Sequence, residues 1–164
     1  MYHVNDSLTW FVFVDIQFGY AATLMLPYLS HCQGRNVNWG ECFLYATSVG
    51  LLATNIIIVN NMRDRLTDVL AGKRTTSVRF GRTFSLLEYF LCFLVAMVAT
   101  LIPAFVPFFS AWRCLPILIV PLAFAEMQCI TRKEGESLNP HVGGAAKIEL
   151  LFCMLVAVGK LVAP

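Results

Sequence analysis

The residues best suited to chemistry in this chain lie between Asn60 and Lys73. Asp64 and Asp68 are four residues apart, and Asn60 lies four residues before Asp64. At 3.6 residues per turn, this spacing predicts that the three side chains share one face of a helix, which Gly72 is suited to end. Two carboxylates on one face repel each other unless something positive lies between them. The pattern therefore predicts a face that binds a cation.

Magnesium fits this pair of carboxylates well. It takes one or two protein carboxylates, keeps several waters and completes its shell with phosphate oxygens of a substrate. Arg63, Lys73 and Arg79 are candidates to hold the remaining phosphate charge, since arginine offers a bidentate fork and lysine a point charge. Such a site would bind a diphosphate and assist its departure. The residues alone leave a second interpretation open, in which the two aspartates only balance the charge of a basic loop.

The composition predicts an all-α integral membrane protein with a single membrane domain over residues 1–164. The 164 residues are 58% hydrophobic and only 13% charged, with a mean hydropathy of +0.69. A soluble domain is nearer half apolar and a quarter charged. The six cysteines form no C-x-x-C pair and are expected to be small buried hydrophobes rather than zinc ligands. The net charge of +2 is small, and no nucleic-acid partner is expected.

Five apolar segments approach the roughly 20 residues that span a bilayer. These predicted spans are Leu8–Leu29, Cys42–Asn60, Phe84–Ile102, Cys114–Ile130 and Ala145–Val162. The loop from Asn61 to Thr83 carries six Lys and Arg residues, and the loop before the last span adds Arg132 and Lys133. Five spans put these two loops on one side, so the positive-inside rule predicts that the Asp64/Asp68 loop is cytoplasmic.

Two further patterns concern helix packing. Ala46, Gly50 and Thr54 form a small-xxx-small row on the second span, which favours close contact with another helix. Asn139 and Pro140 are typical of the N-cap and first turn of a helix, here the last one.

The acidic segment also resembles a known family. The run Gly50 to Asp64, followed by Asp68, Gly72-Lys73 and Gly81, resembles the second acidic motif of the dihydroxynaphthoate polyprenyltransferases. These are menaquinone-pathway members of the UbiA prenyltransferase superfamily. Leu138-Asn139-Pro140 ahead of a final apolar helix is similar to the end of these enzymes.

The resemblance implies an enzyme of the inner (cytoplasmic) membrane that transfers a polyprenyl group from polyprenyl diphosphate to dihydroxynaphthoate, using Mg²⁺. It implies that Asp64 and Asp68 are catalytic and bind the metal. It also implies that four residues hold the diphosphate. These are Asn60, Asn61, Arg63 and Lys73.

This chain departs from the family pattern in length and in motif number. The family fold is a bundle of about nine helices with two acidic motifs, whereas this sequence predicts five helices and contains one motif. Asp6 and Asp15 are isolated. The resemblance therefore implies the carboxyl-terminal half of such a protein, with a missing N-terminal half as an expected partner.

Other functions compete with this one. CDP-alcohol phosphatidyltransferases also use aspartates and a metal, but the D-G-x-x-A-R run that they need is absent. A small membrane carrier subunit would use Asp15, Glu126 and Glu149 for ions, which leaves Asp64 and Asp68 unexplained. An inactive remnant that binds prenyl diphosphate is the third alternative. The sequence predicts no metal role for His3, His31 or His141, which are solitary.

Overall fold

The computed structural model describes residues 38–105 and 110–162, and the predicted span Leu8–Leu29 lies outside them. Within these two ranges every regular element is a helix, which agrees with the predicted class. The elements are α2 (Trp39–Arg63), α3 (Arg65–Leu70), α4 (Thr76–Phe105), the 3₁₀ helix η1 (Ala111–Ile119), α5 (Val120–Arg132), the short 3₁₀ helix η2 (Gly135–Leu138) and α6 (Asn139–Val162).

Three of these stretches are long and apolar enough to cross a membrane. They are α2 with 25 residues, α4 with 30, and the continuous stretch Ala111–Arg132 with 22. The fourth long helix, α6, has 24 residues and carries Lys147, Glu149 and Lys160 along its length. Each of the four predicted spans inside the described ranges therefore corresponds to a long helical stretch.

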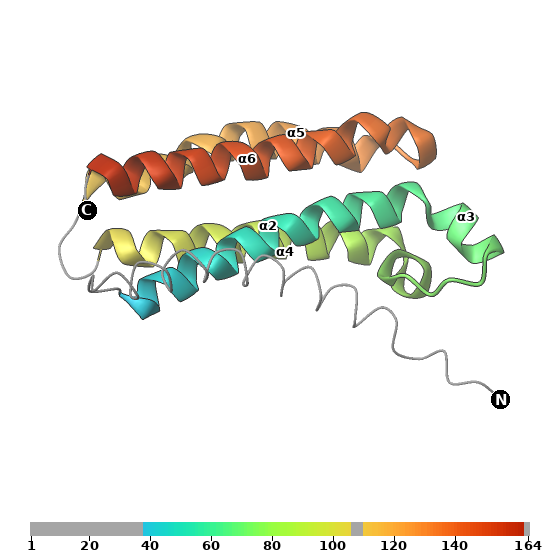
Figure 1. Ribbon diagram of the computed structural model, residues 1–164. Coiled ribbons are helices and arrows are strands. Elements are labelled where there is room, and N and C mark those ends of the chain that lie inside the picture. Colours follow the sequence, from blue (N-terminus) through green and yellow to red (C-terminus); the bar gives the residue numbers. More distant parts are fainter. Residues whose placement is uncertain (1–37, 106–109, 163–164) are drawn as a thin grey trace.

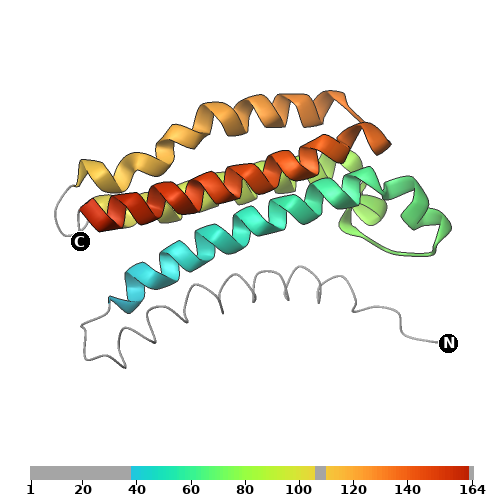
Figure 2. The same cartoon turned by 45° about the horizontal axis from the view of Figure 1, so that its top comes forward.

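The long helices run side by side, with α3 at one end of the bundle (Figures 1 and 2). Helices α2 and α4 are antiparallel neighbours, and α6 packs against α2 as well as η1. One apolar cluster surrounds Leu52, Met97 and Phe152, and a second surrounds Ile58, Tyr89 and Ile130. The second cluster includes Met62 and Leu138, so it lies directly beneath the end of α2 that carries the acidic segment.

Small residues bring α2 close to its neighbours, as the sequence predicts. Ala46 is fully buried, Thr54 is 2% exposed, and Gly50 is also buried. On the same helix, Ser48 donates to the carbonyl of Ala96 (2.9 Å), and Thr100 donates to Ser48 (2.8 Å). These bonds join α2 to α4 inside an apolar environment, where buried hydroxyl groups need partners.

The chain bends sharply at Gly81 near the start of α4. Gly81 has φ 83° and ψ 173°, a conformation that residues with a side chain rarely adopt. Across the bend, the buried hydroxyls of Ser77 and Ser85 lie 2.7 Å apart. The predicted span began at Phe84, and the helical stretch before it was missed because a bend of this kind leaves no apolar periodicity.

The last helix begins six residues before its predicted start at Ala145. Asn139 already has helical angles (φ −49°, ψ −48°), because η2 leads directly into α6. The prediction that Asn139 is an N-cap is therefore wrong. Pro140 does fit the first turn, where its missing N–H costs nothing.

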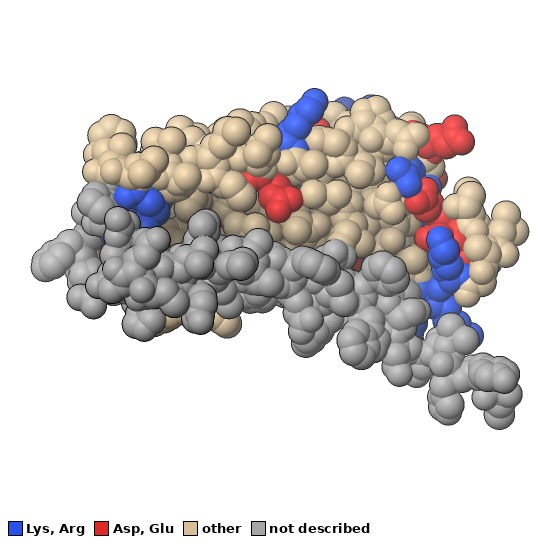
Figure 3. Space-filling model, viewed as in Figure 1, with Lys and Arg blue, Asp and Glu red and all other residues tan. Residues whose placement is uncertain are grey.

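Large apolar side chains remain exposed along the sides of the bundle. Leu118, Phe124, Leu151 and Met154 are each more than 40% exposed. In the view of Figure 3, Lys, Arg, Asp and Glu gather mostly at the end where α3 lies. Apolar sides and polar ends are what a lipid bilayer requires of a helix bundle.

Candidate active site

The acidic segment lies at the end of α2, where the helix is interrupted at Asp64. Asp64 has φ −89° and ψ 5° and separates α2 from α3. The Asp64 N–H still donates to the Asn60 carbonyl (3.0 Å), and the Asp68 N–H donates to the Asp64 carbonyl (2.8 Å). The three residues therefore follow one another at turn spacing, as predicted. The single continuous helix expected through Gly72 is wrong, since the axis breaks at Asp64.

The end of α3 returns the chain toward Asp68. Gly72 has a positive φ of 71°, its N–H donates to the Val69 carbonyl (3.1 Å), and the Lys73 N–H donates to the Asp68 carbonyl (2.9 Å). This is a Schellman motif, in which glycine takes the left-handed position that ends a helix. It brings the Lys73 ammonium to 3.0 Å from the Asp68 carboxylate, which is only 7% exposed. Gly72 thus ends α3, and Lys73 after it pairs with Asp68.

Arg63 holds Asp64 through a two-pronged contact. Its Nε donates to Asp64 Oδ1 (2.7 Å) and its Nη2 to Asp64 Oδ2 (2.6 Å), while Nη1 donates to Asn139 Oδ1 (3.1 Å). Two parallel charge-assisted bonds are the strongest form of such a pair. The guanidinium beside it holds the pKa of the Asp64 carboxyl below its usual range, so Asp64 is ionised at neutral pH.

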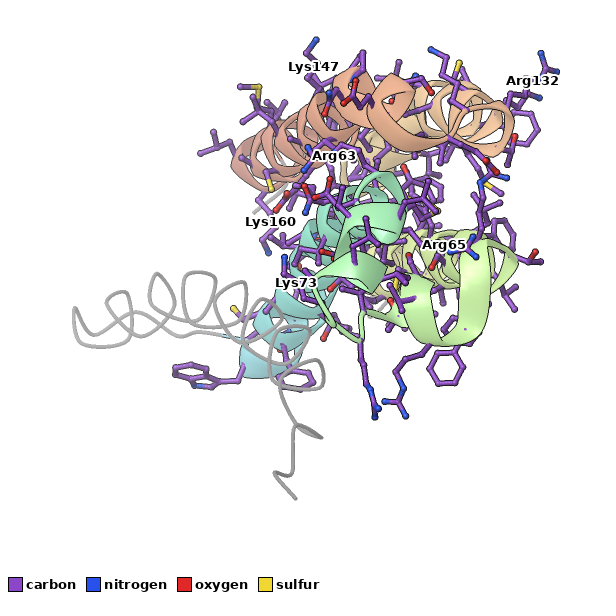
Figure 4. The ribbon with its side chains drawn as sticks, turned by 90° about the vertical axis from the view of Figure 1, so that its right-hand side faces the viewer. Arg63, Arg65, Lys73, Arg132, Lys147 and Lys160 are labelled. Carbon is purple, nitrogen blue, oxygen red and sulfur yellow. The ribbon has the colours of Figure 1, made fainter. Side chains whose placement is uncertain are left out.

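The site as a whole carries more positive than negative charge. Between Arg63 and Arg74 the chain has four cations and two carboxylates. In Figure 4, Arg63 lies at the end of α2 near α6, and Lys73 lies below it near the end of α3. With each aspartate already next to one cation, the surplus charge favours an anionic ligand.

The other predicted residues are less closely tied to the carboxylates. Asn60 and Asn61 are both half-buried beside the break in the helix. Arg79 is exposed, and its guanidinium lies 5.4 Å from the centre of the Phe80 ring. The structure therefore places Arg63 and Lys73 against the aspartates and Asn60 one turn before Asp64, whereas Arg79 lies over the Phe80 ring.

A second polar group escaped the sequence analysis. His141 Nδ1 lies 2.6 Å from Glu126 Oε1, and Lys133 Nζ lies 2.8 Å from His141 Nε2. Glu126 belongs to α5 and His141 to α6, so no helical spacing relates them. The sequence marks Glu126 as an ionisable residue in an apolar run, a candidate for contact with an ion or a substrate, and gives His141 no metal role. The position of Glu126 within an apolar run is the one feature of the sequence that points to this polar group.

The oxygen donors of the acidic segment suit the expected cation. Among the described residues, no group of three or more His, Cys, Asp or Glu side chains lies close enough to hold a metal. Magnesium needs only one or two protein carboxylates when phosphate oxygens supply the rest. Asp64 and Asp68, on consecutive turns and with oxygen donors only, fit that requirement.

Comparison with known proteins gives the class to which the chain belongs. Residues 8–142 match the UbiA prenyltransferase family, so the chain belongs to that family. It is 26% identical over 147 residues to 1,4-dihydroxy-2-naphthoate octaprenyltransferase of Mycobacterium leprae, covering 89% of this chain and 48% of that protein. It is 30% identical over 118 residues to the Escherichia coli protein of the same name, covering 71% and 38%. No solved structure matches significantly.

These relatives confirm the family resemblance that the acidic segment predicted. A further relative of the same name, from Haemophilus influenzae, is 30% identical over 120 residues. The chain spans less than half the length of each of these three curated relatives.

Proposed function

We propose that this chain forms the diphosphate-binding part of a membrane prenyltransferase. The reaction is transfer of a polyprenyl group from a polyprenyl diphosphate to 1,4-dihydroxy-2-naphthoate in menaquinone biosynthesis. The observation that carries the proposal is the arrangement of Asp64 and Asp68 on consecutive turns, each paired with a cation, in a chain of the UbiA family. The names of the three relatives supply the substrates.

The residues of this chain divide the work of holding the leaving group. Arg63 donates one N–H of each nitrogen to Asp64 or Asn139, so the second N–H groups of Nη1 and Nη2 are the ones left for phosphate oxygens. Lys73 adds a point charge beside Asp68. Asn60 and Asn61 offer amide donors at the same helix end. Asp64 and Asp68 would hold Mg²⁺, which would further neutralise the charge of the diphosphate. Together these groups stabilise the negative charge that develops as the diphosphate departs.

The surroundings of the site suit a lipid donor. Apolar helices extend from the site along the bundle, so the polyprenyl tail would lie in the bilayer while its diphosphate reaches the polar end (Figure 3). We place that end on the cytoplasmic face of the inner membrane, in line with the positive-inside rule. An N-terminal half with the remaining helices completes the pocket for the aromatic acceptor.

The test is prenyl transfer in membranes that contain this chain, with and without the N-terminal half of a relative. Asp64→Asn and Asp68→Asn are expected to abolish Mg²⁺-dependent product formation, because each removes an anionic ligand from the metal. Glu136→Gln is the matched control, since Glu136 is an exposed carboxylate at the same end of the bundle.

Membrane insertion is measured in parallel and should be unchanged in all three variants. Product only in the complemented sample supports a split enzyme. Unchanged turnover in both aspartate variants would falsify the assignment. No product in any sample would favour the carrier or the inactive remnant.

A further inference from the structure

The polar chain formed by Lys133, His141 and Glu126 lies next to the candidate active site, yet the proposed reaction does not use it. His141 is 7% exposed, and the Glu126 side chain is 18% exposed. Their contacts of 2.6 Å and 2.8 Å join the middle of α5, and the residue that follows its end, to the first turn of α6. Buried ionisable groups carry a high desolvation cost, so an arrangement of this kind needs a structural or functional reason.

The direction of each hydrogen bond follows from the donors present. An ammonium can only donate, so the Lys133 Nζ donates to His141 Nε2. His141 Nδ1 then carries the hydrogen and donates it to the Glu126 carboxylate. The imidazole is thus fixed in one orientation between two helices.

Glycine makes room for this contact. A Cβ added at Gly144 would collide with the carboxylate of Glu126, so the absence of a side chain allows Glu126 to lie against α6. Arg82 holds the other end of the same turn, because its Nη2 lies 2.9 Å from the carbonyl oxygens of Ile130, Thr131 and Lys133. The turn between α5 and α6 is therefore held at both ends.

This turn contributes directly to the diphosphate site. Asn139 lies two residues before His141, and its Oδ1 accepts the hydrogen bond from Arg63 Nη1 at 3.1 Å. Leu138, beside it, is 1% exposed and belongs to the same apolar cluster as Met62, the neighbour of Arg63. Since Nε and Nη2 of Arg63 are occupied by Asp64, Asn139 is the group that fixes the third guanidinium nitrogen.

We propose that Asn139 is a positioning residue of the diphosphate site, kept in place against Arg63 by the His141–Glu126 contact. Asp64 and Asn139 together then hold all three guanidinium nitrogens before a diphosphate arrives, so that Arg63 loses less freedom on binding. This inference rests on the proposed function, because it assigns a role in binding the same diphosphate. The turn between α5 and α6 then contributes to the site through Asn139, which lies 76 residues along the chain from Arg63.

The experiment measures binding of inorganic pyrophosphate with Mg²⁺ to the purified chain in detergent by calorimetry. Asn139→Ala is expected to weaken binding about tenfold, which corresponds to losing one hydrogen bond to a charged group. Asn139→Asp keeps the acceptor oxygen and should bind at least as well as Asn139→Ala. Arg63→Lys keeps the charge but lacks the fork, and should lose about as much as Asn139→Ala.

The decisive comparison is the double variant. If Asn139 acts through Arg63, then Asn139→Ala adds little to the loss already caused by Arg63→Ala. His141→Asn retains a donor toward Glu126 and should bind within about twofold of the wild type, whereas His141→Leu should bind as poorly as Asn139→Ala. The thermal unfolding temperature is measured for every variant, because a general loss of structure would lower it together with the binding.

Wild-type binding in the Asn139→Ala variant would overturn the inference and leave the proposed function standing. Fully additive losses in the double variant would do the same. If the wild-type chain itself binds no pyrophosphate, the proposed function and this inference fall together.

Discussion

Lys73 has a role in the fold as well as in the proposed site, because it pairs with Asp68. Asp68 is buried at the side chain, and the glycine turn returns Lys73 to within 3.0 Å of it. Lys73→Ala should weaken Mg²⁺-dependent pyrophosphate binding by about tenfold, because it removes a phosphate partner and leaves a buried carboxylate unpaired. Titration calorimetry measures the change, and Arg74→Ala at an exposed neighbour is the control. Equal losses in both variants would show that only the overall charge matters.

At the same scale, local spacing determined what the sequence could reveal. Asn60, Asp64 and Asp68 were predicted together because helix geometry alone brings residues four apart into line. Asn139 and His141 were not predicted as part of the site, because their contacts with Arg63 and Glu126 depend on how distant helices pack. No periodicity in one sequence encodes a contact across 76 residues.

The contact between α5 and α6 depends on Gly144, and the adjacent Gly143 provides a matched control. Gly144→Ala would place a Cβ against the Glu126 carboxylate, whereas a Cβ at Gly143 meets nothing within 4 Å. Because the carboxylate is the flexible end of its side chain, Gly144→Ala should displace it from His141 and lower the free energy of unfolding by about 1–3 kcal/mol, the cost of a lost hydrogen bond to a charged group. Gly143→Ala should be neutral or stabilising by up to about 1 kcal/mol, because alanine favours a helix. Unfolding in mixed micelles measures both, and equal stability of the two variants would contradict the close contact.

The helices themselves were predicted well, but their ends were not. Apolar runs of about 20 residues predicted the four described spans, because a helix that crosses a bilayer must be apolar over about that length. The bend at Gly81 and the early start of α6 at Asn139 were missed, since both are set by backbone hydrogen bonds and polar contacts rather than by hydropathy. The stretch Ala111–Ile119 is a 3₁₀ helix containing Pro116, where a normal helix was expected.

For the molecule as a whole, the two ends of the bundle have different charge. Glu41 at the end opposite α3 lies 2.7 Å from Lys160 and 3.4 Å from Arg113, so that end is largely paired within the bundle. The end with the acidic segment carries the surplus of cations between Arg63 and Arg74. Such an excess is retained on the cytoplasmic side during insertion, so the whole-molecule charge pattern should fix the orientation.

Cysteine labelling in a variant without the native cysteines tests this orientation. Arg74→Cys at the α3 end and Ala111→Cys at the start of η1 introduce thiols at two exposed positions near opposite ends of the bundle. In intact bacterial cells, a maleimide that cannot cross the membrane should label the thiol at 111 and not the one at 74. Permeabilised cells, in which both thiols should react, provide the control. Labelling of position 74 alone in intact cells would place Asp64 and Asp68 on the outer face and contradict the proposed orientation.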